Sequence, residues 1–357
     1  MTIETGLKQH YGMLATKSNM VLNNIDRIAA PPADVFYQEY ILPQRPAIIT
    51  NMFDNSSLRQ MDTLEKVRIG LTDIPVQICP NYIANLLDST SGDVPRMMNL
   101  GAYLDFLQAQ PTTLDICVEY PTPQKLLELL PLNLYQNFND ESDLYSNMFV
   151  AASNNYAHLH YDADQRNVLL FQVFGAKRFV LIHPRETQKL DAIEQANLCR
   201  TSGIFLENMS EAEKTDFLQY TNAFDAVLYP GETIFMPMMI WHYIEYLEPA
   251  MSIAYRLGRN PYNRRLANLF PAPSVDVQSL SLLLQDETQA QLHHLEWLNK
   301  LEAVSHSLAG NESDRRDTLN YLSLRIRGQY LGLEPIKNIR ELRRREAMLN
   351  KSLGGKV

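Results

Sequence analysis

Cysteine is scarce in this chain of 357 residues, which contains only Cys79, Cys117 and Cys199. The three are isolated, their number is odd, and none belongs to a CxxC spacing. Disulfide-rich secreted domains and cysteine zinc sites both need paired or clustered cysteines. The sequence therefore predicts neither a disulfide framework nor a structural zinc site of that kind.

An excess of basic residues is also absent. Lys and Arg number 32 against 41 Asp and Glu, which gives a net charge of −9. Proteins that bind nucleic acid mainly through its phosphates need an excess of basic over acidic residues, so we expect no nucleic-acid partner. No apolar run reaches the roughly 18 residues that cross a bilayer, and residues 1–18 show no signal-peptide pattern. We therefore expect a cytoplasmic protein that does not bind membranes.

The hydrophobic pattern divides the chain into three regions. Residues 1–140 mix helical and strand patterns, 141–260 consist of short β-rich runs with turn residues between them, and 261–357 carry apolar residues at helical spacing. Many short strands favour a sandwich or barrel, so the predicted fold class is α+β with an N-terminal α/β decoration and a C-terminal helical tail. The patterns predict helices over 31–38, 58–71, 100–108 and 123–130, and strands over 46–50, 74–79, 114–119, 145–152, 167–174, 178–182, 226–229, 233–237 and 251–256.

The strongest chemical signal is the motif His160-Tyr-Asp162, which is followed 80 residues after the aspartate by His242. A single HxD pair is weak evidence, because it often occurs by chance. Residues two apart on a strand project from one face, so His160 and Asp162 can reach one metal ion. His242 ends the run PGETIFMPMMIWH, a β-turn-β pattern that brings a second imidazole from a distant strand. Two imidazoles and one carboxylate are the ligand set that holds non-haem iron on one face and leaves positions open.

Two segments, HYDADQRNVLLFQVFGAKRFVLIHP (160–184) and PGETIFMPMMIWHYIEYL (230–247), resemble the JmjC/cupin-8 oxygenases. This family includes the asparaginyl hydroxylase that modifies hypoxia-inducible factor. The lead-in IDRIAAPPADVFYQEYILPQRPAIITNMF (25–53) is similar to theirs as well. The resemblance implies a double-stranded β-helix (a jelly roll of the cupin type) as the catalytic core over 141–260. It also implies that iron(II) is bound by His160, Asp162 and His242, with 2-oxoglutarate and O2 as co-substrates.

The resemblance also assigns residues to the co-substrate. Lys177 matches the lysine that pairs with the distal carboxylate of 2-oxoglutarate, a role that suits a cation on a long stem. Asn167 matches an amide near the metal. The family usually has Thr or Ser three residues before the first histidine, where this chain has Ala157. A tyrosine is expected to replace it, and the choice stays open among Tyr145, Tyr156 and Tyr120.

Two further residues have open roles. Arg256 stands where the family often has asparagine, so it serves the co-substrate carboxylate, reaches an acidic substrate, or forms a salt bridge at the barrel rim. His158 shares a face with His160 in a regular strand. Same-face residues are roughly 7 Å apart, which argues against a ligand set built from residues 158, 160 and 162 alone. We expect His158 to lie behind a ligand or to face the substrate.

Three classes of function remain. The first is hydroxylation of a protein or peptide side chain, and the second is hydroxylation of a small molecule such as an amino acid or natural-product intermediate. The third is a non-enzymatic cupin-like binding module, against which the intact ligand set and Lys177 argue. Lysine demethylation is a further enzymatic option that no chromatin-reading motif supports. The apolar helical face after residue 273 also predicts a homodimer.

Overall fold

The computed structural model describes residues 24–41, 43–81, 94–131, 145–162, 166–190, 201–238 and 240–257. The predicted helical tail and homodimer contacts of 261–357 lie outside these residues. Among the helices that are described, none is both long and apolar enough to cross a membrane.

The larger of two main sheets has seven strands, and β8 and β13 lie near its centre. Strand β8 is buried along its whole length, which agrees with its almost continuous apolar sequence NVLLFQVF. Only β1 and β2 pair in parallel, and the other pairs in this sheet are antiparallel. In spatial order the strands are β1 (Asp26–Ile28), β2 (Ala47–Ile49), β11 (Thr233–Met236), β8 (Asn167–Phe174), β13 (Ala250–Leu257), β6 (Tyr145–Ala151) and β5 (Cys117–Pro121).

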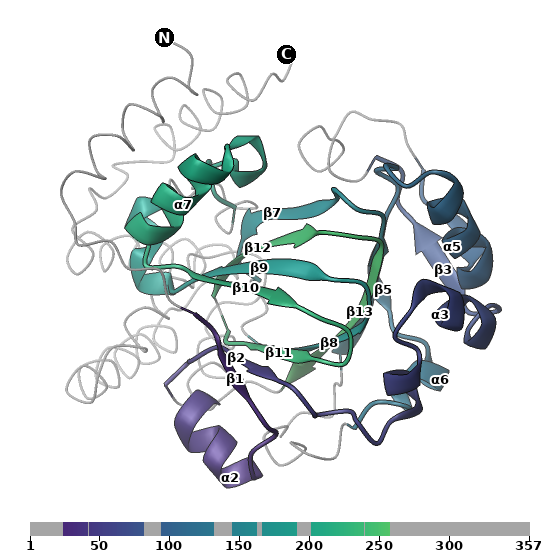
Figure 1. Ribbon diagram of the computed structural model, residues 1–357, viewed down its shortest axis with the longest axis horizontal. Helices are drawn as coiled ribbons and strands as arrows, with labels where there is room; N and C mark the ends of the chain where they lie inside the picture. Colours follow the sequence, from purple (N-terminus) through teal and green to yellow (C-terminus); the bar gives the residue numbers. More distant parts are fainter. Residues whose placement is uncertain are drawn as a thin grey trace, which may run out of the picture.

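The second main sheet has four antiparallel strands and faces the first across the molecule (Figure 1). Its order is β10 (Phe224–Leu228), β9 (Lys177–Ile182), β12 (Trp241–Tyr246) and β7 (Tyr156–His160). Side chains alternate between the two faces of each strand, so every strand here contributes to two different cores. On β9, Phe179 and Leu181 point between the sheets, while Val180 and Ile182 point outward.

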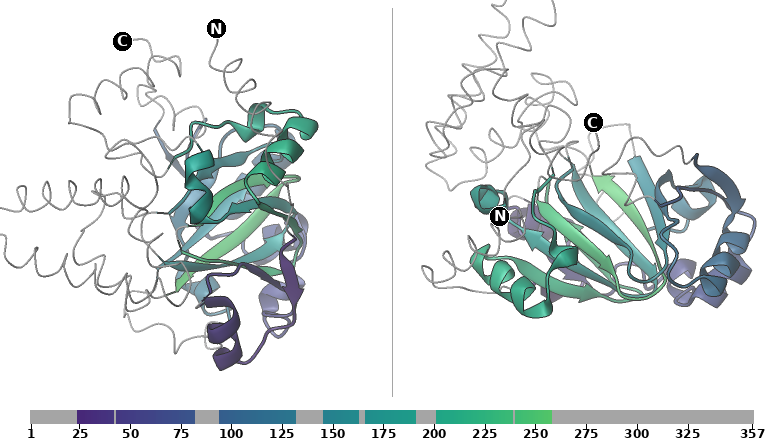
Figure 2. Two further views of the ribbon diagram at one scale, coloured as in Figure 1. Left: turned by 90° about the vertical axis from the view of Figure 1, so that its left-hand side faces the viewer. Right: turned by 90° about the horizontal axis from the view of Figure 1, so that it is seen from above.

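Helices cover the outer faces of both sheets (Figures 1 and 2). The N-terminal elements pack on the outside of the seven-stranded sheet through a core that includes Phe171, Ile253 and Tyr103. They are α2 (Ala33–Phe36), the π-helical turn η1 (Tyr37–Ile41), the 3-10 turn η2 (Ser57–Gln60), α3 (Leu64–Gly70), the hairpin of β3 (Pro75–Ile78) and β4 (Arg96–Asn99), α5 (Leu100–Ala109) and α6 (Gln124–Leu127).

The four-stranded sheet is covered on its outside by α7 (Glu211–Tyr220) and the 3-10 turns η4 (Pro184–Lys189) and η5 (Leu206–Asn208). Ser210 begins α7 with a capping box, in which its hydroxyl accepts from the Glu213 amide and the Glu213 carboxylate accepts from the Ser210 amide. Phe217 and Leu218 of α7 pack on Trp241 and Tyr243 of β12. This packing holds the strand that carries His242.

The domain boundaries predicted at residues 140 and 260 remain a prediction. Strands β1, β2 and β5 precede residue 140, yet they hydrogen-bond into the same sheet as β6, β8, β11 and β13. The described part of the first region is thus continuous with the β-rich region in hydrogen bonding. The mixture of β-sheets and a few helices agrees with the predicted α+β class at that level.

Candidate metal centre

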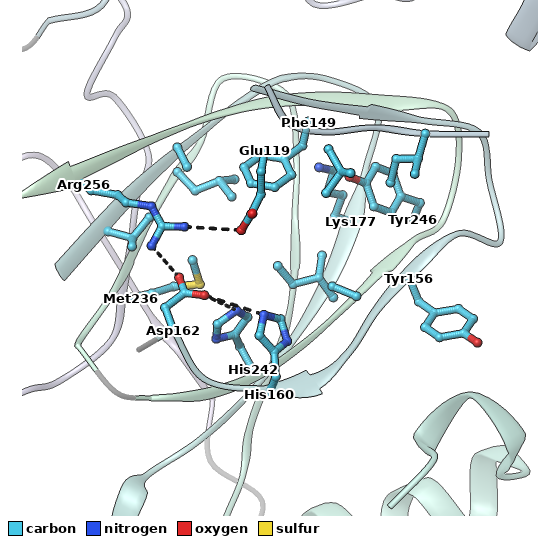
Figure 3. Close-up of a pocket in the computed structure, with 17 residues that line it drawn as sticks. Glu119, Phe149, Tyr156, His160, Asp162, Lys177, Met236, His242, Tyr246 and Arg256 are labelled. Carbon is cyan, nitrogen blue, oxygen red and sulfur yellow. Dashed lines mark hydrogen bonds and ion pairs between the residues drawn. The ribbon is translucent and has the colours of Figure 1, made fainter. Parts of the chain in front are cut away.

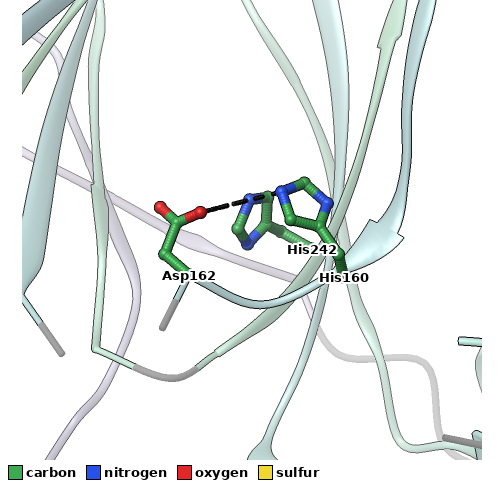
Figure 4. A group of neighbouring side chains, drawn as sticks. All are labelled: His160, Asp162 and His242. Atoms are coloured by element: carbon green, nitrogen blue, oxygen red, sulfur yellow. Dashed lines mark ion pairs between the residues drawn. The ribbon is translucent and has the colours of Figure 1, made fainter. Parts of the chain in front are cut away.

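The structure brings His160, Asp162 and His242 together at one end of the space between the two sheets (Figure 4). His160 is the last residue of β7 and pairs directly with His242 on β12. Asp162 lies two residues beyond the strand. Its Oδ1 is 3.7 Å from His160 Nε2 and 4.0 Å from His242 Nε2, and the three ligand atoms lie within 4.8 Å of one another. Two imidazole nitrogens and a carboxylate oxygen therefore converge on one point.

Hydrogen bonds to the backbone set the tautomer of both histidines. His160 Nδ1 is 2.6 Å from the carbonyl oxygen of His158, and His242 Nδ1 is 3.1 Å from that of Ile240. A carbonyl oxygen can only accept, so each Nδ1 carries the hydrogen and each Nε2 presents its lone pair. Burial, helped by the nearby His242, lowers the pKa of His160. A neutral imidazole with a free Nε2 lone pair is the form that binds a metal ion.

The second oxygen of Asp162 is held from the opposite sheet. Arg256, on β13, donates from Nη1 to Asp162 Oδ2 over 2.8 Å. Burial raises the pKa of Asp162, but its electrostatic interactions with His242 and Arg256 outweigh burial and hold that pKa below its usual range. The carboxylate is thus ionised and ready to bind a cation. Of the roles considered for Arg256, the structure shows a salt bridge, and its acidic partner is the predicted metal ligand itself.

A pocket extends from these three residues to Lys177, between the two sheets (Figure 3). Its walls are largely apolar and come from both sheets: Phe149, Val168, Leu170 and Ala254 from one, Ile244 and Tyr246 from the other. Aromatic and aliphatic walls with a few convergent polar groups are typical of small-molecule sites.

Lys177 is buried in this pocket, with 2% of its surface exposed. Its ammonium donates to Ser252 Oγ over 2.6 Å and lies 4.0 Å from the centre of the Tyr246 ring. Within the described part of the chain it forms no ion pair, and burial lowers its pKa well below the ordinary value. A buried cation without a counter-ion is costly, and a bound anion would relieve that cost. This observation fits a carboxylate of 2-oxoglutarate in the pocket.

A bulge in β7 changes which side chains face the pocket. His242 pairs with His160, but Ile244 pairs with Ala157, so β7 contains one extra residue across this stretch. Ala157 consequently lines the pocket beside His160. The expectation that His158 shares a face with His160 is wrong for this reason. His158 instead lies 3.0 Å from Glu207 Oε1 and 2.8 Å from the Ser202 carbonyl oxygen, on the other side of the strand.

Asn167 and Tyr156 are two further residues that the sequence predicts to bind the co-substrate. Asn167 is absent from the pocket lining, and its Oδ1 accepts from the Met238 amide over 2.9 Å, within the segment that leads to His242. Tyr156 lines the pocket, but its ring stacks on Tyr243 and its hydroxyl points away from the other labelled residues (Figure 3). Burial and the carboxylate of Glu207 raise the pKa of that hydroxyl to about 12.

Of the other two candidate tyrosines, Tyr120 is absent from the pocket lining. Tyr120 lies on β5 and packs partly against the core outside the sheet. Tyr145 begins β6, and its side chain lies outside what the structure describes. The roles of Asn167 and the tyrosines toward the co-substrate therefore stay predictions.

Sequence reasoning missed three residues of the site: Tyr246, Ser252 and Glu119. The first two had a signal, because Tyr246 is four residues after His242 on one strand and Ser252 is four before Arg256 on another. Even spacing on a strand keeps residues on one face. Glu119 had none, because it lies at a bulge in β5 with φ +48°. Its side chain is 56% exposed at the rim, with Oε1 3.9 Å from Arg256 Nη2.

Comparison with known proteins assigns this chain to a family. The family model for the Cupin-like domain matches residues 32–256, which is well over half of the chain. The chain belongs to the Cupin-like domain family. The match includes all three candidate metal ligands, Lys177 and Arg256, and it spans the described strands from β2 to β13.

Curated relatives agree with that assignment. The chain is 26% identical over 258 residues to Lysine-specific demethylase 8 of Danio rerio, covering 67% of this chain and 60% of the relative. It is 22% identical over 268 residues to JmjC domain-containing protein D of Dictyostelium discoideum (66% and 58%), and 22% identical over 250 residues to Lysine-specific demethylase JMJ30 of Arabidopsis thaliana (66% and 55%). The matched region thus spans about three-fifths of these relatives or less. The predicted resemblance to JmjC/cupin oxygenases is confirmed, and family membership supports the prediction of a 2-oxoglutarate dioxygenase.

Proposed function

We propose that this protein is an iron(II)- and 2-oxoglutarate-dependent dioxygenase that hydroxylates a side chain of a protein or peptide. One observation carries the proposal: a two-histidine, one-carboxylate donor set lies in the same pocket as a buried lysine that forms no ion pair with the described residues. The first suits iron(II), and the second suits the far carboxylate of 2-oxoglutarate. We also propose that the two facing sheets form the double-stranded β-helix predicted from the sequence.

Each residue has a definite task in this proposal. Iron(II), 2-oxoglutarate and O2 together supply the oxidation of a C–H bond. His160, Asp162 and His242 supply three donors on one side, which leaves the pocket side for the co-substrates. Lys177 binds and orients the anion at the far end of the pocket. The apolar walls exclude water, so the lysine–carboxylate pairing is stronger than it would be in solvent.

The nature of the substrate is supported by the relatives. Two of them are named lysine-specific demethylases, which favours a polypeptide substrate and keeps lysine demethylation as a second candidate. Hydroxylation of a small molecule remains the alternative, and it would require the pocket to close over its substrate. A non-enzymatic binding module would have no need for both the donor set and Lys177. Arg256 is engaged by Asp162, so an acidic substrate loses its proposed partner.

Succinate release tests the activity. Purified protein with iron(II), 2-oxoglutarate and O2 should form succinate, and His160→Ala and Asp162→Ala should abolish it because each removes a metal ligand. His183→Ala is a matched control, since His183 follows β9 and is absent from the pocket lining. It should retain turnover within about twofold, in line with substitutions away from the chemistry. Unchanged turnover in both ligand variants would contradict the proposal.

The substrate itself is found by mass spectrometry. Candidate peptides and metabolites are incubated with the enzyme and searched for addition of one oxygen atom or loss of a methyl group. Products on peptides alone support the first proposal, demethylated lysines support the second candidate, and products on metabolites alone support the small-molecule alternative. The predicted homodimer stays a proposal, and light scattering of the full chain in solution tests it.

A further inference from the structure

We propose that Arg256 is a positioning residue of the metal centre, which holds Asp162 so that a single carboxylate oxygen faces the metal. This inference rests on the metal site proposed above and concerns how the chain builds it. The family position that often holds asparagine has arginine here, and the structure shows a specific partner for it.

Asp162 needs an external partner because the sheet does not hold it. It lies two residues beyond the end of β7, outside the ladder that orients His160 and His242. A free carboxylate can rotate and present either oxygen or both. Here Arg256 Nη1 binds Oδ2 over 2.8 Å, while Oδ1 faces the two histidines. A charge-assisted hydrogen bond of this length is among the strongest that side chains form, so it selects this rotamer.

Arg256 is itself held rigidly. It is 6% exposed and lies on β13, which is paired on both sides, with β6 and with β8. Opposite it in the ladder are Tyr145 and Val168, and its second Nη atom is 3.9 Å from Glu119. A side chain on a central strand positions its partner more precisely than one on a loop. Because β13 belongs to the sheet opposite both histidines, the Arg256–Asp162 ion pair spans the pocket at the candidate metal site (Figure 3).

Arg256 affects metal affinity in two ways that have opposite signs. The direction of the change in affinity therefore shows which effect is larger. Its positive charge repels a divalent cation, so removal of the charge alone would tighten binding. Its hydrogen bond orients the ligand, so loss of that bond would weaken binding. Partners behind a metal ligand typically contribute 10–100-fold in metal affinity. The proposal therefore predicts weaker binding in Arg256→Met even though a repulsive charge has gone.

The experiment is a calorimetric titration of Mn(II) into the metal-free full chain, without 2-oxoglutarate. Arg256→Met should raise the Kd on the order of 10–100-fold, and Arg256→Lys, which keeps a donor, should lose less. Arg178→Met is the matched control, because Arg178 pairs with Asp225 through two 2.9 Å hydrogen bonds outside the pocket. It should change the Kd by less than about twofold. Thermal unfolding of each metal-free variant reports whether the fold is intact.

The outcomes separate this inference from the proposed function. Equal or tighter Mn(II) binding by folded Arg256→Met overturns the positioning role and leaves the metal site standing. The same Kd in wild type and His242→Ala overturns the metal site itself, and this inference with it. If Arg256→Met does not fold, Arg256→Lys and Arg256→Gln decide, and wild-type affinity in both overturns the role.

Discussion

Lys177 is a buried lysine without an acidic partner among the described residues, and this isolation distinguishes it from Lys214. Lys214 is also buried, but its ammonium lies 3.0 Å from Glu211 Oε1. Among the described residues, the Lys177 ammonium has the Ser252 hydroxyl and the ring faces of Tyr246 and Phe149 nearby. A buried charge with no counter-ion destabilises the folded protein, and proteins keep such groups where function needs them.

We predict that Lys177→Met abolishes 2-oxoglutarate binding and raises the free energy of unfolding of the ligand-free protein. Burial lowers the pKa of Lys177, so the folded state disfavours the ammonium. That penalty is complete at pH values below the folded-state pKa, shrinks as the pH rises through it, and is gone above the unfolded-state pKa, so the gain should be larger at lower pH. Urea unfolding at several pH values measures it.

Lys214→Met is the control for that prediction. It replaces a buried lysine that has a carboxylate partner, so it should give no gain in stability and leave 2-oxoglutarate binding intact. If Lys177→Met, like Lys214→Met, gave no gain in the free energy of unfolding, the role given to Lys177 would be contradicted.

At the scale of elements, the turn between β8 and β9 delivers Lys177 to the pocket. Gly175 adopts φ +70°, and a Cβ there would lie 2.1 Å from the backbone carbonyl oxygen of Pro249. Only glycine allows both the left-handed conformation and the close approach of the chain before β13. In the sequence Gly175-Ala-Lys177, the glycine thus permits the backbone conformation and the lysine supplies the charge.

We predict that Gly175→Ala lowers the free energy of unfolding by more than about 2 kcal/mol, because a left-handed alanine alone costs roughly 1–2 kcal/mol and the clash adds to it. It should also weaken 2-oxoglutarate binding, because Lys177 is displaced. Gly70→Ala is the control: its nearest obstacle is the flexible end of Met61 at 3.1 Å, and Gly70 ends a helix. Denaturant unfolding compares the two, and equal stability of both variants would be the contrary result.

For the whole molecule, the candidate site is the place where two sheets meet. The proposed metal ligands come from the four-stranded sheet and its continuation, while Arg256 and Ser252 come from the seven-stranded sheet. A ligand that fills the pocket therefore contacts both sheets and binds only the folded protein. Its binding free energy adds directly to stability.

We predict that Mn(II) with 2-oxoglutarate raises the melting temperature. At 100 times the Kd, one ligand adds about 2.7 kcal/mol, which corresponds to a rise on the order of 5–10 °C for a domain of this size. Differential scanning fluorimetry measures the shift. His242→Ala should remove most of it, because the metal loses a ligand, and an undiminished shift in that variant would point to binding elsewhere.

Much of the fold could be predicted from local pattern. The predicted strands over 167–174, 178–182, 233–237 and 251–256 correspond to β8, β9, β11 and β13, and the helix over 100–108 corresponds to α5. Others were missed. Strand β7 is short, and its bulge interrupts the alternation by which a strand is recognised. Helix α7 has a capping box, but its charged sequence EAEKTDFLQY shows little apolar periodicity.

The sequence alone predicted the proposed metal ligands His160, Asp162 and His242 and the proposed co-substrate residue Lys177, because these residue types suit those tasks and stand in a specific motif. It could not determine which way neighbouring side chains point, since one extra residue in β7 turns His158 outward and Ala157 inward. Nor could it pair Arg256 with Asp162, which are 94 residues apart and lie on opposite sides of the pocket. Such pairings depend on how the two sheets pack against each other, and only the tertiary structure decides that.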